Sequence, residues 1–158
     1  MNAKMPELKG CFEAAGFTSV KTVLSSGNVV FDTPLKSLSE IEQRCEAAMQ
    51  KQLKRTFYTI VRSVRGLEKM LQDDPFAKFP VPRDAKRVVS FLRQPRKPAP
   101  PLPAKLVNAT IFAAHDADIF SAYVPGPEGP VFMKLIERTF GKDITTRTWD
   151  TVKKCAKA

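Results

Sequence analysis

The sequence has few of the residues on which metal and cofactor chemistry depends. Its only histidine is His115, and its three cysteines, Cys11, Cys45 and Cys155, are far apart and form no CxxC pair. This spacing excludes a disulfide framework and a zinc knuckle. The seven glycines form neither GxGxxG nor GxxxxGK[ST], which argues against the common nucleotide-binding loops. We therefore expect no metal and no cofactor, and we interpret residues 115–118 as a turn.

Long apolar runs are also missing, and the residues after Met1 lack the apolar core of a signal peptide. The 158 residues are 43% hydrophobic, with a mean hydropathy of −0.23. This composition is typical of a globular protein rather than a disordered or fibrous one. We expect a cytoplasmic protein with reduced thiols and no membrane association.

Basic residues are abundant and unevenly spread. The chain has 26 Lys and Arg against 16 Asp and Glu, a net charge of +10, and residues 51–97 hold thirteen basic and four acidic side chains. Such a segment favours anionic partners, although net charge also serves solubility. Aromatic residues interleave with the cations, a mixture that suits single-stranded nucleic acid when the rings face outward. The expected nucleic-acid contacts are Lys54, Arg55, Arg62, Arg83, Lys86 and Arg87.

Hydrophobic periodicity predicts a series of elements in the first half of the chain. Ser37 and Glu40 fit a capping box, Ser63 fits an N-cap, and Gly27 suits a tight hairpin turn. The expected helices cover residues 6–15, 38–54 and 64–71, and the expected strands cover 20–24, 28–31 and 57–61.

The second half is rich in proline between residues 75 and 103. The tract 95–103 favours an extended polyproline connector over an SH3-type ligand. Pro130 should open a helix that Gly141 ends, and Asp150 should cap a terminal helix. The expected strands cover 87–92, 110–113, 119–124 and 144–147, with a short helical piece at 104–107.

This order predicts an α+β protein made of two tandem ferredoxin-like (split βαβ) subdomains, residues 1–73 and 74–158. The first subdomain has the same order without its first strand. A missing central strand would leave backbone groups unpaired, so we expect a truncated start and self-association by strand swapping.

Two motifs resemble the bacterial family known as domain of unknown function 1697. They are Ser25-Ser26-Gly27-Asn28-Val29-Val30-Phe31, and Thr145-Thr146-Arg147-Thr148-Trp149-Asp150-Thr151-Val152 after Lys134-Leu135. Residues 2–8 resemble the helix start that follows the first strand and glycine-rich segment of the family. The resemblance likewise implies a pair of ferredoxin-like subdomains, and it implies no particular activity. The family's usual R-N-W-N-T corresponds here to Arg147-Thr148-Trp149-Asp150-Thr151. Met133 stands where the family commonly has a serine before the Lys-Leu pair.

The C-terminal motif offers a second candidate site, an anion clamp at the start of the last helix. Its expected residues are Lys134, Arg138, Arg147, Trp149, Asp150 and Thr151. The alternative is structural: Trp149 would anchor the helix in the core, and Asp150 would cap it. We interpret the chain as a non-catalytic binding or interaction module with an anionic ligand, nucleic acid or phosphate. The alternative function is an enzyme that acts on a small phosphorylated or carboxylated metabolite, and no catalytic residue can be named for it.

Overall fold

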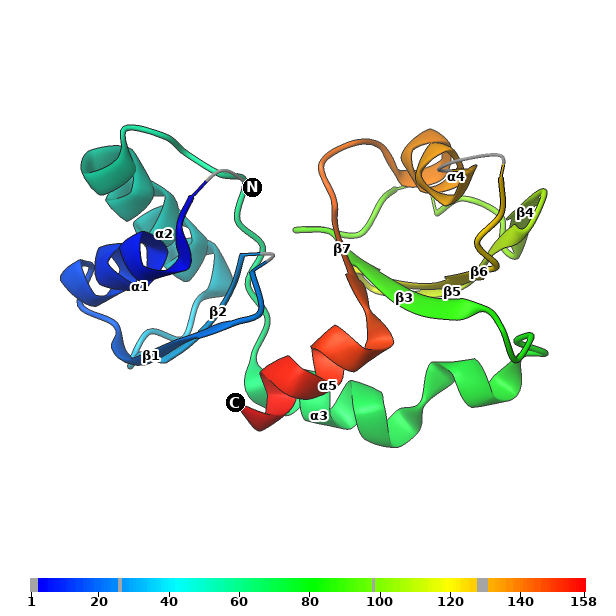
Figure 1. Cartoon of the computed structure of the whole chain (residues 1–158), viewed down its shortest axis with the longest axis horizontal. Coiled ribbons are helices and arrows are strands. Elements are labelled where there is room, and N and C mark those ends of the chain that lie inside the picture. The colour runs from blue at the N-terminus through cyan, green and yellow to red at the C-terminus, as the bar shows by residue number, and fades with distance from the viewer. Residues whose placement is uncertain (1–2, 26, 98, 128–130) are drawn as a thin grey trace. The chain divides into compact units, whose positions relative to one another are not determined.

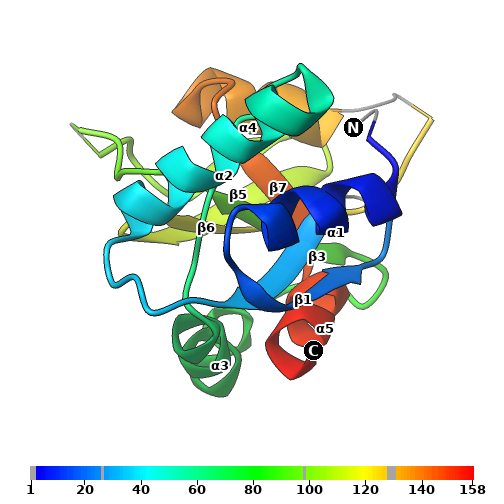
Figure 2. The same ribbon diagram turned by 90° about the vertical axis from the view of Figure 1, so that its left-hand side faces the viewer.

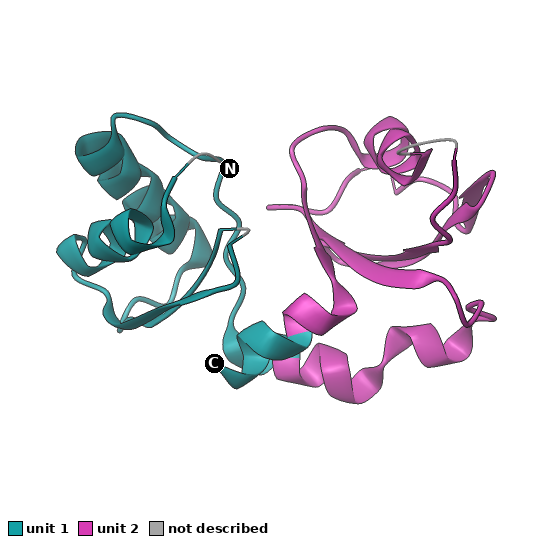
Figure 3. Ribbon diagram, viewed as in Figure 1, with its two compact units in different colours: residues 1–67, 153–158 teal, residues 68–152 magenta. Residues whose placement is uncertain are grey.

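A computed structural model describes residues 3–25, 27–97, 99–127 and 131–158. Within these residues the chain is an α+β protein with five α-helices and two antiparallel sheets (Figure 1). It divides into two compact units, residues 1–67 with 153–158 and residues 68–152 (Figure 3). We describe each unit by itself.

The first unit contains a β-hairpin covered by two helices. These elements are α1 (Met5–Ala14), β1 (Thr18–Val23), β2 (Asn28–Asp32) and α2 (Leu38–Leu53), as the periodicity predicts. Strands β1 and β2 pair antiparallel, and α1 and α2 lie side by side over them (Figures 1 and 2). The sequence thus identifies all four elements to within about two residues.

Local capping explains where these elements begin and end. Gly27 in the hairpin turn has a φ of +90°, a conformation that costs glycine little because it has no Cβ. At the start of α2, the Ser37 hydroxyl accepts a hydrogen bond from the Glu40 backbone N–H, 3.3 Å away. This bond satisfies one of the N–H groups that a helix start leaves unpaired.

The apolar faces of these elements meet in one hydrophobic core. Phe17 and Phe31 stack there, with ring centroids 4.3 Å apart. Its buried members are Leu8, Cys11, Phe12, Phe17, Val20, Ile41, Cys45 and Met49. Leu38, at the start of the predicted apolar stripe of α2, is instead exposed, because the first turn of α2 extends past the core.

The strand predicted at residues 57–61 is wrong. Phe57 and Val61 do pack against the core, but no strand in the described chain pairs with this segment. Side chains of α2 take its hydrogen bonds instead: the backbone N–H of Thr59 donates to Glu46 Oε2 at 3.2 Å, and that of Val61 donates to Glu42 Oε2 at 3.3 Å. The alternating apolar pattern explains why one side of this segment is buried, but a strand also needs a neighbouring backbone for its hydrogen bonds.

The rest of the chain forms a five-stranded antiparallel sheet and its flanking helices. The strand order is β4-β5-β6-β3-β7, so β3, the first of these strands in the chain, lies between β6 and β7. The elements are α3 (Val64–Asp73), the 3₁₀ helix η1 (Pro75–Lys78), β3 (Lys86–Phe91), β4 (Ala104–Leu106), β5 (Ala109–His115), β6 (Asp118–Tyr123), α4 (Val131–Phe140), β7 (Thr145–Thr148) and α5 (Trp149–Lys157).

The two faces of this sheet carry different cores. On one face Val88 and Ile119 pack against α4 through Phe132, Leu135 and neighbouring apolar residues. On the other face the ring of Phe120 contacts those of Phe76 and Trp149. Figure 1 shows α4 on one side of the sheet and the start of α5 on the other. Alternation along each strand therefore decides which face a side chain joins.

Three further predictions meet different outcomes here. Residues 104–106 form strand β4 rather than a helix, because they pair with β5 from Ala104 opposite Ile111 to Leu106 opposite Ala109. Gly141 ends α4 with a φ of +90°, as predicted. Pro130, the predicted start of that helix, lies outside the described residues.

Candidate functional site

Trp149, a member of the predicted anion clamp, lies in the protein core. Its side chain is 6% exposed, and its ring centroid is 5.0 Å from that of Phe76 and 6.5 Å from that of Phe120. A ring buried in this way presents no flat face to a ligand in solution. It anchors the start of α5 to the sheet.

The polar residues beside Trp149 bond mainly within the protein. Thr148 caps α5, because its Oγ1 accepts the N–H of Thr151 at 3.2 Å and lies 3.0 Å from the Thr151 hydroxyl oxygen. The predicted cap, Asp150, is exposed in the first turn of the helix. Asp150 is therefore not the capping residue, because helix α5 starts at Trp149, two residues earlier than a cap at Asp150 implies. The Arg147 guanidinium donates to the Thr146 carbonyl at 2.9 Å.

The remaining members of the predicted clamp lie on α4. Lys134 and Arg138 are exposed on that helix, which covers one face of the sheet. The register places Arg147 on the opposite face, since it pairs with Val89, and Val89 pairs with the Trp149 contact Phe120. The structure thus groups Arg147 with Trp149 and separates both from the cations of α4.

The six cations proposed for nucleic-acid contact are divided between the two units. Lys54, Arg55 and Arg62 belong to the first unit, whereas Arg83, Lys86 and Arg87 belong to the second. All but the half-buried Arg62 are exposed. The Arg87 guanidinium lies 5.9 Å from the centroid of the Phe76 ring, a cation–π arrangement.

The aromatic residues interleaved with these cations mostly pack inside the protein. Phe57 joins the core of the first unit, Phe91 is buried, and Phe79 stacks on Phe112 with ring centroids 5.0 Å apart. Tyr58 is the exposed member of the set, at 46%. The rings therefore form no continuous platform for stacked bases.

Metal and thiol chemistry find little support in the described residues. No group of three or more His, Cys, Asp or Glu side chains there is placed to hold a metal ion. Asp116 has a φ of +53° in the turn between β5 and β6, as expected of a turn aspartate. Burial raises the pKa of Cys45 to about 12, with smaller contributions from nearby Cys11 and two glutamates. A thiol with such a pKa is inert at neutral pH.

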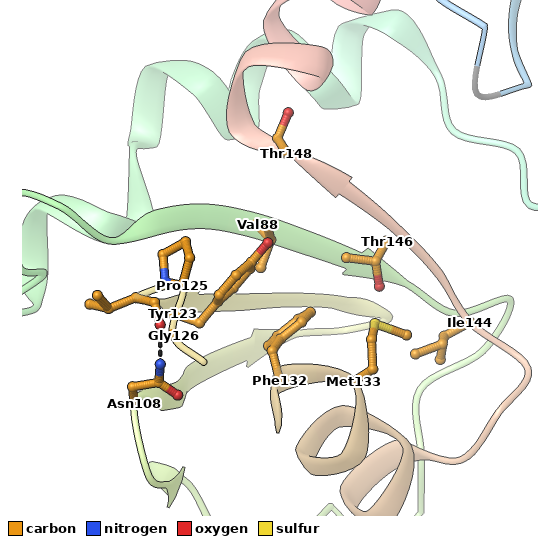
Figure 4. Close-up of a pocket in the computed structure, with 11 residues that line it drawn as sticks. Val88, Asn108, Tyr123, Pro125, Gly126, Phe132, Met133, Ile144, Thr146 and Thr148 are labelled. Carbon is orange, nitrogen blue, oxygen red and sulfur yellow. Dashed lines mark hydrogen bonds between the residues drawn. The ribbon is translucent and has the colours of Figure 1, made fainter. Parts of the chain in front are cut away.

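A pocket of about 510 Å³ opens between α4 and the sheet of the second unit (Figure 4). Its size lies within the usual range of small-molecule sites, roughly 300–1,000 Å³. Apolar and hydrogen-bonding side chains both line it, and none of them is an Asp, Glu, His, Lys, Arg or Cys. The lining side chains are Val88, Asn108, Tyr123, Val124, Pro125, Phe132, Met133, Ile144, Thr146 and Thr148, together with Gly126.

Two polar side chains, Tyr123 and Asn108, lie at one end of this pocket beside Pro125 and Gly126 (Figure 4), and we call it the polar end. Tyr123 stacks on Phe132, with ring centroids 5.1 Å apart. The Asn108 side-chain amide donates to the Val124 carbonyl, and its backbone carbonyl accepts the Val124 N–H at 3.0 Å. The preceding residue, Val107, has a φ of +53°, an outlier for a β-branched residue. A strained turn thus holds Asn108 in place, as is common at functional sites.

Both threonine hydroxyls of the pocket lining already have partners. Thr146 Oγ1 lies 2.8 Å from Ser90 Oγ across β3 and β7, and Thr148 bonds to Thr151. Ser121 differs, because its hydroxyl is fully buried without a hydrogen-bond partner among the described residues. It pairs with Val88 and precedes Tyr123 by two positions, so it lies on the sheet face that forms the pocket floor.

Lys86 is the neighbour of Tyr123 across strands β3 and β6. It is exposed and stands directly opposite Tyr123 in the β3–β6 register, two residues before Val88 on the same face. The Cβ atoms of such a pair are about 4.5–5.5 Å apart. Lys86 therefore lies next to a residue that lines the pocket, a placement that the sequence did not reveal.

Sequence reasoning missed this pocket as a whole. Its lining residues come from several separate segments of the chain. Two signals were present: Thr146 and Thr148 belong to the C-terminal motif, and Met133 stands where the family often has serine.

These features define an α+β protein with two antiparallel sheets and a pocket between α4 and the larger sheet. The chain belongs to the family described as Protein of unknown function (DUF1697), whose model matches residues 1–119, and the predicted membership is confirmed. A search of the curated proteins found no match. Among solved structures, the chain is similar to the conserved bacterial protein SP0830 from Streptococcus pneumoniae, with a TM-score of 0.64 and 16% identity over 99% of this chain and 88% of that one. At that identity the likeness shows the fold. No helix of the described chain has the length and apolarity to cross a membrane.

Proposed function

We propose that the chain is a non-catalytic binding module whose pocket in residues 68–152 holds a small molecule with an anionic group, a carboxylate or a phosphate. The observation that supports this is the pocket itself, which joins apolar walls with a few fixed polar groups. Binding sites for small molecules combine these two features. An anionic group is supported by Lys86, because a cation next to the pocket-lining Tyr123 favours a ligand of opposite charge.

The enzyme alternative is less well supported. General acid–base catalysis needs a titratable side chain within hydrogen-bond reach of the substrate. Tyr123 is the one titratable side chain among the residues that line the pocket, and no Asp, Glu, His, Lys, Arg or Cys accompanies it there. A binding function needs no such group.

Nucleic acid is the less favoured anionic ligand. Because most of the aromatic rings pack inside the protein, only positive charge attracts nucleic acid. The affinity of such binding does not depend on the nucleotide sequence and falls steeply as salt rises. In a titration with single-stranded oligonucleotides, we expect weak binding that disappears as salt rises. Tight binding at physiological salt would favour nucleic acid over the small molecule.

The proposal is tested with a fragment library of small carboxylic acids and phosphate esters, with the melting temperature as readout. Met133→Trp fills the pocket from a position that is 37% exposed, so it should leave the fold intact. The neighbouring Lys134→Trp adds the same ring on the exposed side of α4 and serves as the control. Fragments should stabilise the wild type and the Lys134 variant but not the Met133 variant. Equal stabilisation of all three proteins would contradict the proposal.

We also propose that the two units are two tandem ferredoxin-like subdomains. In support, the order β5-β6-β3-β7 matches the second, third, first and fourth strands of that fold, all antiparallel. In the first unit, α1, β1, β2 and α2 follow in the corresponding order. Hydrogen exchange by NMR would test it, since β3 should be the most protected strand of its unit.

A further inference from the structure

We propose that the ligand of this pocket is a small amphiphilic monocarboxylate, bound with its carboxylate beside Tyr123 and its apolar body beside Met133 and Ile144. This inference rests on the proposed binding function and narrows it to one class of molecule and one orientation. Figure 4 shows the basis: Asn108 and Tyr123 lie at one end of the pocket with Pro125 and Gly126, and Met133 and Ile144 lie at the other end with Thr146.

The polar end holds the groups that recognise a carboxylate. The Tyr123 hydroxyl is a hydrogen-bond donor, and Lys86 opposite Tyr123 supplies a positive charge. The Asn108 side chain is fixed by its bond to the Val124 carbonyl, and its NH2 group has a second N–H that can donate to a carboxylate. A charge-assisted hydrogen bond from an ammonium is among the stronger polar contacts in proteins.

The opposite end of the pocket presents mainly apolar groups to a ligand. Met133 and Ile144 face each other there beside Thr146 (Figure 4). The Thr146 hydroxyl is engaged by Ser90, 2.8 Å away, so it mainly presents its methyl group. The ring of Phe132, which stacks on Tyr123, lies between Tyr123 and this end (Figure 4). An apolar chain or ring fits this end, because its burial releases water without leaving a polar group unpaired.

The charge at the polar end favours a carboxylate over a phosphate. Lys86 is the cation that the register places beside Tyr123, and its single charge balances one negative charge. Arg87 belongs to the other face of the sheet, where its guanidinium lies over the Phe76 ring. A phosphate monoester carries between one and two negative charges at neutral pH and would keep an unbalanced part of its charge.

The experiment compares three probes that share one apolar chain: octanoate, octanol and octyl phosphate. Isothermal titration of the full chain measures their affinities, and amide chemical shifts report where they bind. We expect octanoate to bind about tenfold more tightly than octanol, a difference of roughly 1.4 kcal/mol. Octyl phosphate should bind less tightly than octanoate.

Two substitutions test the orientation. Lys86→Met should weaken octanoate about tenfold and leave octanol unchanged, whereas Lys105→Met is the matched control. Lys105 is also an exposed strand cation, and its partner Thr110 pairs with Ala122 on the other sheet face. Met133→Asn should weaken octanoate and octanol equally, because both place their chains at that end.

Each alternative outcome has a distinct meaning. If octyl phosphate binds the pocket more tightly than octanoate, the carboxylate class is wrong and the binding function stands. If octanol binds as tightly as octanoate, or if Lys86→Met has no effect, the assigned orientation is wrong. If no octyl probe binds, the amphiphilic class is wrong, and the fragment library alone decides whether the pocket binds small molecules.

Discussion

Ser90 and Thr146 face each other across strands β3 and β7, and their hydroxyl oxygens lie 2.8 Å apart. Ser90 is fully buried, so Thr146 is the group that satisfies its hydroxyl. The pair ties β3 to the edge strand β7, which leads into α5. Thr146 also lines the pocket, so the stability of the sheet and the shape of the pocket depend on the same bond.

Thr146→Val should therefore destabilise the protein although valine has almost the same shape. The Ser90 hydroxyl would lose its partner, and a buried unpaired group costs about 1–3 kcal/mol. Adding Ser90→Ala should recover most of the loss, since both polar groups are then gone. Urea denaturation of the single and double variants measures the free energy of unfolding. Thr145→Val, on the same strand, is the control and should change little. Additive losses in the double variant would contradict this pairing.

Trp149→Ala should be much more damaging than Arg147→Ala. Trp149 is buried against Phe76, and truncation of a buried tryptophan costs about 3–5 kcal/mol. Arg147 is half-buried on the edge strand, and we expect a loss of about 0.5 kcal/mol. Thermal unfolding of both variants is best measured by far-UV circular dichroism, because Trp149 is the only tryptophan and its loss removes the fluorescence signal. Equal losses would make Arg147 a structural residue as well.

Thr148→Ala should destabilise α5 more than Asp150→Asn does. Loss of the capping hydroxyl that accepts the Thr151 N–H should cost about 1 kcal/mol. Asp150 contributes only a favourable charge in the first turn, roughly 0.3–1 kcal/mol. Thr148→Ser keeps the cap and should behave almost as the wild type. A larger loss for Asp150→Asn would indicate that Asp150 caps the helix after all.

The three cysteines should differ in reactivity and in their effect on alkaline stability. Burial raises the pKa of Cys11 and of Cys45, the latter to about 12. N-ethylmaleimide at neutral pH should therefore modify Cys155, which is partly exposed, well before the other two. Mass spectrometry of the native and urea-treated protein measures this order.

The raised pKa of Cys45 also determines how the free energy of unfolding changes with pH. An unfolded cysteine ionises near pH 8.5, far below the folded value for Cys45, so the folded state binds protons more tightly. The free energy of unfolding is then unaffected below about pH 8.5 and falls as pH rises toward 12. Cys45→Ala should flatten this decline, although it lowers stability at neutral pH by leaving a small cavity. An equally steep decline in the variant would exclude Cys45 as its source.

Much of the secondary structure could be predicted because it depends on neighbours along the chain. The Ser37 cap and the positive φ of Gly27 and Gly141 are local features, and each appears where the sequence placed it. The predictions were wrong where a segment far away in the sequence determines the local structure. Residues 57–61 have the composition of a strand, but the carboxylates of α2 take their N–H groups. Residues 104–106 form a strand because β5 is available to pair with them.

The sequence by itself determined the family, the α+β class and most of the helix and strand positions, because capping, periodicity and turn chemistry act over a few residues. Only the tertiary structure decided the site. Trp149 entered the core because Phe76 and Phe120 surround it, which removed it from the predicted clamp. The pocket exists because the β3–β6 and β3–β7 registers set Tyr123 and Thr148 beside Val88, while α4 covers them with Phe132. A shift of one residue in either pairing would turn these side chains to the other face, and no local pattern encodes that register.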